Sequence, residues 1–152
     1  MTSTHLGVHH VGLYAKDPAA AAVFYRDVMG MQVVGSGGAG HPLGAHAFLS
    51  SRPDEEAHEV ALFANPDIRH VAFKVATLAD LRSFYGRVRD LGVPVKHVMD
   101  NGVALAFYFD DPDGNMIEVY WPTGTPDRAS EPLDLSQTEE EIRARLSLRP
   151  SL

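Results

Sequence analysis

An internal duplication constrains the fold of this chain more than any other feature of its sequence. The dipeptide His10–Val11 recurs as His70–Val71, and Phe24–Tyr25 recurs as Phe84–Tyr85, both at an offset of 60 residues. Each dipeptide sits in the same apolar pattern, so the matches indicate two copies of one structural module. The sequence therefore predicts a fold built from two equivalent halves.

Both copies carry the same succession of elements. Each begins with a strand of alternating apolar residues, continues with a helix whose apolar residues recur with a period of 3.6, and ends with three further strands. In the first copy, Asp17 and Pro18 suit the start of the helix and Gly30 suits its end. The order βαβββ, occurring twice, predicts an α+β fold with helices packed on one sheet face. The expected elements are strands 7–14, 31–35, 45–50 and 58–64 with helix 17–29, then strands 69–76, 94–98, 103–110 and 115–121 with helix 78–91.

A chain of 152 residues suits one domain followed by a short tail. We expect a single domain over residues 1–123, with module one at about 6–65 and module two at about 66–122. Residues 124–152 are expected to form a linker and a short helix at about 137–147. That helix has acidic residues early and arginines late, the charge order that the helix dipole favours.

Composition excludes several classes of protein. The chain has no cysteine, which rules out disulfides, zinc–thiolate sites, iron–sulfur clusters and cysteine nucleophiles. The net charge is −7 and no block of Lys and Arg occurs, so nucleic acid is not an expected partner. No apolar run approaches the ~20 residues that span a bilayer, and no signal-peptide pattern opens the chain. We therefore expect a cytoplasmic protein that does not bind membranes.

Two histidines occupy equivalent places in the duplicated modules. Because side chains alternate along a strand, Val11 and Leu13 share one face of the first strand, and His10 projects from the other. His70 holds the same position in the second module, and Glu118 lies within an apolar strand, where a carboxylate needs a partner. Two imidazoles and one carboxylate form the facial triad of non-haem Fe(II) oxygenases. Taken singly, each histidine is more often a surface or core residue, and Glu118 could instead pair with a nearby cation.

At these residues the chain resembles the vicinal oxygen chelate superfamily, which includes glyoxalase I, fosfomycin and bleomycin resistance proteins, and type I extradiol dioxygenases. The resemblance covers about residues 6–122. It implies a cupped sheet made of paired βαβββ modules with the helices outside, and a divalent metal held inside the cup. The family places its metal ligands at positions that correspond to His10, His70 and Glu118 here.

Within the superfamily, the chain resembles the small one-domain extradiol, or catechol-type, dioxygenases. Their signature includes a Tyr ten residues before the ligand Glu, which corresponds to Tyr108 and Glu118, with the turn Asp111–Gly114 between them. The segment that begins at His58 resembles the one that carries the family's acid–base histidine. Related dioxygenases often have a histidine where this chain has Asn101. The resemblance implies ring cleavage with His58, Tyr108 and Asn101 in the catalytic pocket.

The same resemblance implies the cofactor and partners. Fe(II) is the expected ion, with Mn(II), Ni(II) and Zn(II) as alternatives, and no organic cofactor is needed. The expected substrates are a small aromatic diol and O2, as in aromatic catabolism, and the expected assembly is a homodimer. Candidate pocket-lining residues, several of which should instead belong to the helix-side core, are Phe48, Leu62, Phe107, Phe109 and Trp121.

Two other functions remain open from the sequence. His58 follows His10 by 48 residues, as Glu118 follows His70 by 48, so His58 could be a fourth metal ligand. Four protein ligands would favour glyoxalase-like isomerase or lyase chemistry. A metal-free protein that binds a drug or metabolite is the third possibility, because one fold hosts unrelated functions. The remaining histidines are expected on the surface or in loops, with His46 the least certain of them because its strand could line the cup: His5, His9, His41, His46 and His97.

Overall fold

The computed structural model describes residues 6–125 and 130–148, and within them the predicted α+β fold is confirmed. The element order is βαβββ twice, followed by a short strand and a helix. The first module comprises β1 (Gly7–Tyr14), α1 (Pro18–Met29), β2 (Gln32–Gly37), β3 (His46–Ser50) and β4 (Val60–Phe63). The second comprises β5 (His70–Lys74), α2 (Leu78–Asp90), β6 (Val95–Asp100), β7 (Ala104–Asp110) and β8 (Met116–Pro122), after a 3-10 turn at Pro66–Ile68. The chain continues with β9 (Glu131–Pro132) and α3 (Glu139–Ser147).

The described chain divides into two compact units. Among the described residues, the N-terminal unit contains 8–72 and 112–117, and the C-terminal unit contains 6–7, 73–111, 118–125 and 130–148. Strands β5 and β8 contribute residues to both units. The assignment of residues 1–123 to one domain stays a prediction.

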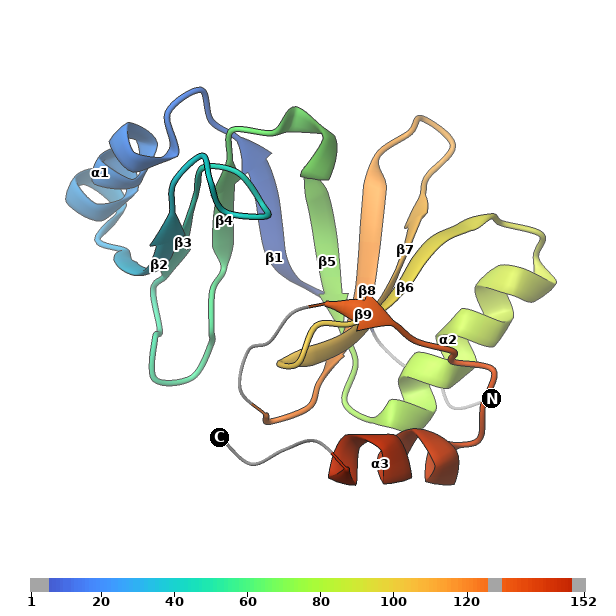
Figure 1. The fold of residues 1–152 in the computed structure, drawn as a ribbon. Helices are drawn as coiled ribbons and strands as arrows, with labels where there is room; N and C mark the ends of the chain where they lie inside the picture. Colours follow the sequence, from blue (N-terminus) through green and yellow to red (C-terminus); the bar gives the residue numbers. More distant parts are fainter. Residues whose placement is uncertain (1–5, 126–129, 149–152) are drawn as a thin grey trace. The chain divides into compact units, whose positions relative to one another are not determined.

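In the N-terminal unit, four strands lie in the order β2-β3-β4-β1. The pairs β2–β3 and β3–β4 are antiparallel, whereas β1 runs parallel to β4, with Val11 opposite Val60. Helix α1 packs against β2, β3 and β4 (Figure 1). The core beneath it is made of small and branched apolar side chains, with Leu13 from β1 packed against it as the alternation predicts: Ala15, Ala22, Ala47, Leu49 and Leu62.

The ends of α1 follow from local chemistry. The side chain of Asp17 accepts a hydrogen bond from the backbone N–H of Ala20, and Pro18 begins the helix. Gly30 ends the helix with φ at +71°, a left-handed conformation that glycine adopts at little cost. The predicted helix 17–29 is thereby confirmed to within one residue.

In the C-terminal unit, the strand order is β8-β7-β6-β9. Helix α2 packs on this sheet, with the ring of Tyr85 in edge contact with the ring of Phe107 at 5.5 Å between centroids. Phe107 and Leu105 are fully buried. Phe107 is therefore a core residue on the helix side of β7.

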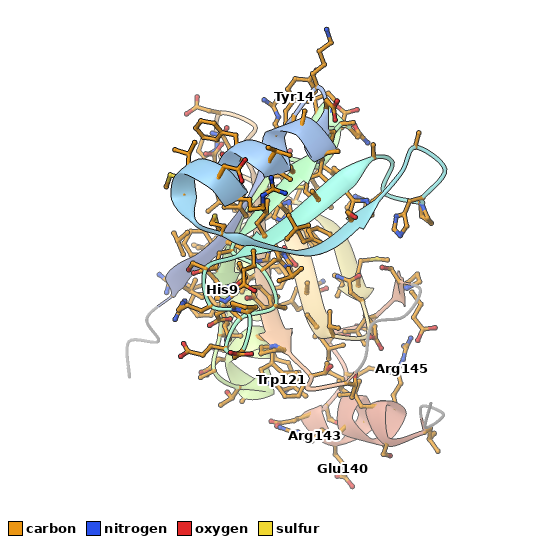
Figure 2. The ribbon with its side chains drawn as sticks, turned by 90° about the vertical axis from the view of Figure 1, so that its left-hand side faces the viewer. His9, Tyr14, Trp121, Glu140, Arg143 and Arg145 are labelled. Carbon is orange, nitrogen blue, oxygen red and sulfur yellow. The ribbon has the colours of Figure 1, made fainter. Side chains whose placement is uncertain are left out.

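The tail packs onto the C-terminal unit of its own chain. Strand β9, which the sequence did not reveal, pairs with β6 through Met99 opposite Pro132. Thr138 and Glu141 form a capping box at the start of α3, and Ile142 is fully buried. Figure 2 shows Arg143 of α3 lying at the indole of Trp121, with its guanidinium 5.4 Å from the ring centre. The predicted tail helix is thus present, two residues shorter at its start.

None of the helices in the described ranges combines the length and the apolar character that crossing a bilayer requires.

Candidate functional site

His10 and His70 face each other from neighbouring parts of the N-terminal unit. His10 lies on β1 and is only 6% exposed, and His70 opens β5. The Nε2 atoms of the two rings are 3.1 Å apart, and the rings meet edge to face with centroids at 5.2 Å. The two histidines that hold equivalent places in the duplicated modules thus meet in the structure.

The protonation of His70 follows from its backbone contact. Its Nδ1 lies 2.8 Å from the carbonyl oxygen of Ile68. A carbonyl only accepts hydrogen bonds, so Nδ1 carries the proton and the Nε2 of neutral His70 presents a lone pair to His10. Two imidazole nitrogens bound to one divalent ion at about 2.1 Å each, at a right angle, lie about 3 Å apart. The His10–His70 pair therefore fits a shared divalent metal.

Gly12 leaves the space that His70 occupies. It lies on the same face of β1 as His10, two residues along. A Cβ atom added at Gly12 would lie 2.7 Å from Nδ1 of His70. Any side chain at this position would push the His70 ring out of its place, so the glycine is part of what positions the pair.

His58 stands next to His10. Its ring centroid is 4.3 Å from that of His10, and its other side stacks on Phe48 at 4.9 Å. Strand β4 begins at Val60, so His58 belongs to the end of the β3–β4 loop and not to a strand beginning at residue 58, as the sequence suggested. Phe48 on β3 thus faces this cluster, while Leu62 on β4 belongs to the helix-side core.

Two histidines that the sequence placed on the surface differ from that expectation. His46 on β3 is buried, 5% exposed, and its ring contacts Phe48 at 4.9 Å. His9 was expected to point away from His10, yet its Nδ1 lies 3.3 Å from Nδ1 of His10. Strand alternation fixes where Cβ points but not where a ring reaches, which explains the second difference. His41 and His97 are exposed, as predicted, and His5 lies outside the described residues.

In the C-terminal unit, Glu118 and Tyr108 are joined by a hydrogen bond. Glu118 on β8 is 6% exposed, and its Oε1 accepts a hydrogen bond of 2.9 Å from the Tyr108 hydroxyl on β7. Burial, and then the nearby Glu118 carboxylate, raise the pKa of Tyr108 well above its ordinary value of 10. Tyr108 therefore stays a neutral hydroxyl donor at physiological pH.

Asn101 extends this chain of hydrogen bonds. Its amide nitrogen donates to the Tyr108 oxygen at 3.3 Å, and its amide oxygen accepts from the Ser130 hydroxyl at 2.8 Å. The amide is thus oriented from both sides, which assigns its oxygen and nitrogen. The sequence predicted that Glu118 needs a partner, and Tyr108 is one partner in the structure. The placing of Asn101 and Tyr108 with His58 in a catalytic pocket stays a prediction.

The arrangement comprises two clusters, one in each unit. The N-terminal unit contributes imidazoles from His10, His70 and His58. The C-terminal unit contributes a buried carboxylate held by a neutral phenol, Glu118 and Tyr108. Imidazole and carboxylate groups are each suited to binding a divalent ion, and an imidazole can also move protons.

Comparison with known proteins identifies relatives in sequence and in structure. Biphenyl-2,3-diol 1,2-dioxygenase 3 of Rhodococcus globerulus is 35% identical to this chain over 131 residues, covering 78% of this chain and 64% of the relative. This chain thus spans less than two thirds of that relative's length. The crystal structure of a Mn(II)-bound glyoxalase from Novosphingobium aromaticivorans matches 80% of this chain and 42% of its own, with a TM-score of 0.62 and 25% identity. A crystal structure of catechol 2,3-dioxygenase matches 85% of this chain and 46% of its own, with a TM-score of 0.63 and 24% identity.

A family profile decides the assignment. Residues 7–119 match the family described as the Glyoxalase/Bleomycin resistance protein/Dioxygenase superfamily. This range contains both βαβββ modules up to the middle of β8, including the two clusters described above. The chain belongs to the glyoxalase/bleomycin resistance protein/dioxygenase superfamily.

Proposed function

We propose that this protein is a metal-dependent extradiol dioxygenase that cleaves the ring of a catechol-like vicinal diol with O2. The observation that carries the proposal is the pair of Nε2 atoms of His10 and His70, 3.1 Å apart, with His70 presenting a lone pair. One relative of this chain acts, by its name, on biphenyl-2,3-diol. Small aromatic diols of that class are the proposed substrates.

The proposed ligand set is His10, His70 and Glu118, two imidazoles and a carboxylate that could hold a metal ion. This set matches the facial triad of non-haem iron enzymes, so Fe(II) is the proposed ion, with Mn(II) as the first alternative. The bound ion would supply Lewis acidity toward the two diol oxygens and the redox chemistry that O2 requires. Each proposed ligand also has a hydrogen-bond partner that orients it. The partner is the Ile68 carbonyl for His70, the ring of His9 for His10 and the hydroxyl of Tyr108 for Glu118.

Tyr108 has two proposed tasks. Its hydroxyl donates to Oε1 of Glu118, which orients that carboxylate. Because its pKa is raised well above 10, Tyr108 keeps its proton and donates it only as a hydrogen bond. It therefore serves as a fixed donor and not as a base.

His58 is the proposed acid–base residue. Its ring lies against His10 on one side and stacks on Phe48 on the other, so its orientation is restricted. An imidazole can take the proton from a diol hydroxyl and return it to the product near neutral pH. Asn101 stands where, by the family resemblance, related dioxygenases often have histidine, and an amide cannot transfer a proton in this way. Proton transfer is therefore assigned to His58, and Asn101 orients Tyr108 through its amide.

A glyoxalase-like isomerase is the second candidate. The observation that favours it is the 4.3 Å between the ring centroids of His10 and His58, close enough for His58 to serve as a fourth ligand. The similarity to a Mn(II)-bound glyoxalase at 25% identity is consistent with it. A homodimeric assembly, as the family resemblance implies, is proposed for either function.

The deciding experiment is oxygen uptake by anaerobically purified protein reconstituted with Fe(II). Catechol, 3-methylcatechol and biphenyl-2,3-diol would be supplied separately, with the ring-opened product followed by its visible absorption. We expect one O2 to be consumed for each diol cleaved. We expect His70→Ala to abolish uptake, while His41→Ala, at an exposed loop histidine, leaves it unchanged. Turnover of a hemithioacetal without oxygen uptake would instead establish the isomerase.

A further inference from the structure

His9 and Glu56 are linked by hydrogen bonds to His10, on the side away from His70. Nδ1 of His9 lies 3.3 Å from Nδ1 of His10, and Nε2 of His9 is hydrogen-bonded to the carboxylate of Glu56. Figure 2 shows His9 on β1, beside the loop that joins β3 to β4 and carries Glu56. Glu56, His9 and His10, from two segments of the chain, thus form one line of hydrogen-bonded groups.

The chemistry of the groups limits the direction of each hydrogen bond. An ionised carboxylate only accepts, so Nε2 of His9 carries a proton and donates it to Glu56. In a neutral His9 ring, Nδ1 then has a lone pair and accepts a hydrogen bond. A neutral His10 donates from only one nitrogen, either from Nε2 to the lone pair of His70 at 3.1 Å or from Nδ1 to His9 at 3.3 Å. The pairing of His9 with Glu56 favours the second, which leaves the lone pair on Nε2 of His10. That is the atom that faces Nε2 of His70.

The line is shielded and its outer end is held in place. The side chains of His9 and Glu56 are only 12% and 17% exposed. The loop that carries Glu56 is fixed by a turn, in which the backbone N–H of Glu56 donates to the Arg52 carbonyl at 2.8 Å. Ser51 ties the same loop to Glu59 through its backbone N–H, at 2.6 Å. Glu56 is thereby presented to His9 by an ordered backbone.

We propose that Glu56 and His9 are positioning residues that fix the tautomer and orientation of His10, so that its Nε2 is held ready for a divalent metal. The inference rests on the proposed function in taking His10 as a ligand. His70 is oriented by a backbone carbonyl, which substitution cannot remove, whereas His10 depends on two side chains. Partners of this kind are generally worth about 10- to 100-fold in metal affinity.

The first test reads the tautomer of His10 in metal-free protein. Nitrogen-15 NMR at pH 8, above the ordinary imidazole pKa of about 6.5, distinguishes a protonated Nδ1 from a protonated Nε2. We expect Nδ1–H on His10 and Nε2–H on His9 in the wild-type protein. In His9→Phe, which keeps a ring but removes both nitrogens, we expect His10 to become a mixture of tautomers. A wild-type His10 protonated at Nε2 would overturn the proposal.

The second test measures affinity with Mn(II) alone, following the free ion by electron paramagnetic resonance. We expect His9→Phe to bind Mn(II) about 10- to 100-fold more weakly, and His9→Gln, whose amide has both a donor and an acceptor, to recover most of the affinity. Glu56→Gln should show an intermediate loss. Glu55→Gln is the matched control, because Glu55 lies in the same loop and pairs with Arg52 at an exposed position.

The outcomes separate this inference from the proposed function. Unchanged Mn(II) affinity in both His9→Phe and Glu56→Gln would overturn the positioning role. A wild-type protein that binds no Mn(II) would overturn the metal-dependent function, while the NMR result would still decide how Glu56 and His9 act on His10. If His9→Phe fails to fold, Glu56→Gln and the wild-type spectrum decide the proposal.

Discussion

The hydroxyl of Tyr108 donates a 2.9 Å hydrogen bond to Oε1 of Glu118, joining β7 to β8 at the buried carboxylate. The carboxylate lies 6% exposed, in an environment where an ionised oxygen depends on donors. Asn101 in turn donates to the Tyr108 oxygen. This series of hydrogen bonds gives Glu118 a fixed orientation, and each donor can be removed by substitution.

Replacing Tyr108 by Phe removes the phenol donor with little change in shape. We expect Tyr108→Phe to lower the free energy of unfolding of metal-free protein by about 1–3 kcal/mol, the usual cost of depriving a buried charged group of a partner. We also expect turnover to fall by about 100-fold. Denaturant unfolding and oxygen uptake measure the two effects. Tyr14→Phe, at a half-exposed position, is the control, and equal losses in both variants would contradict the assigned role.

Gly12→Ala tests the space that His70 needs. The added Cβ would meet Nδ1 of His70 at 2.7 Å, so the ring must move. We expect divalent metal affinity to fall at least about 10-fold, because the ligand is no longer aligned. Calorimetric titration with Mn(II) measures this. Gly7→Ala, on the same strand, adds a Cβ that meets nothing within 4 Å and should bind as wild type does. Wild-type affinity in Gly12→Ala would show that His70 is not held as described.

His58→Gln distinguishes the two candidate functions. If His58 transfers protons, the variant keeps its metal and loses turnover by about 100-fold or more. If His58 is a fourth ligand, the variant loses metal affinity along with activity. We expect the first result, from metal analysis and oxygen uptake on the same samples. His41→Gln is the matched control at an exposed loop position.

Much of this architecture could be predicted from the sequence because it depends on local patterns. The offset of 60 residues identified both modules, and Asp17 and Gly30 marked the ends of α1. Strand β9 could not be predicted from the sequence, because a two-residue strand ending in Pro132 has no periodic pattern. It forms only because β6 offers it an edge.

The candidate site shows the same division between local and long-range information. The duplication pointed to His10 and His70 together, and the dioxygenase-like spacing linked Tyr108 to Glu118. The sequence placed His46 on the surface, although His46 is buried on β3. Alternation alone also could not tell that Phe107 lies in the helix-side core while Phe48 faces the histidines. The two-residue alternation of a strand shows that its two faces differ, but it does not show which face a helix covers. Glu56 sits in a charged loop, where nothing in the sequence marks it as a partner of His9.

Glu59 gives the protein an acid-sensitive contact. The Ser51 hydroxyl and backbone N–H lower the pKa of Glu59 from 4.5 to about 2. Because the folded pKa lies below the ordinary one, this stabilisation is complete above pH 4.5 and is lost as the pH falls toward 2. We expect Glu59→Gln to lose about 1 kcal/mol at pH 7, a figure reduced for solvent screening, and to lose less as the pH falls. Urea unfolding at several pH values checks this, with Glu55→Gln as the control; a difference that grows below pH 4.5 would contradict it.

Metal stoichiometry tests the central claim most directly. Metal-free protein would be loaded anaerobically with Fe(II) and desalted. The iron bound per chain would then be measured by elemental mass spectrometry. We expect about one ion per chain in the wild-type protein and in His46→Ala, a buried histidine outside the proposed triad, as a single facial triad requires. We expect only background in His10→Ala, His70→Ala and Glu118→Ala, each folded by circular dichroism. A wild-type protein without stoichiometric metal, or a Glu118→Ala variant that keeps its ion, would contradict the account.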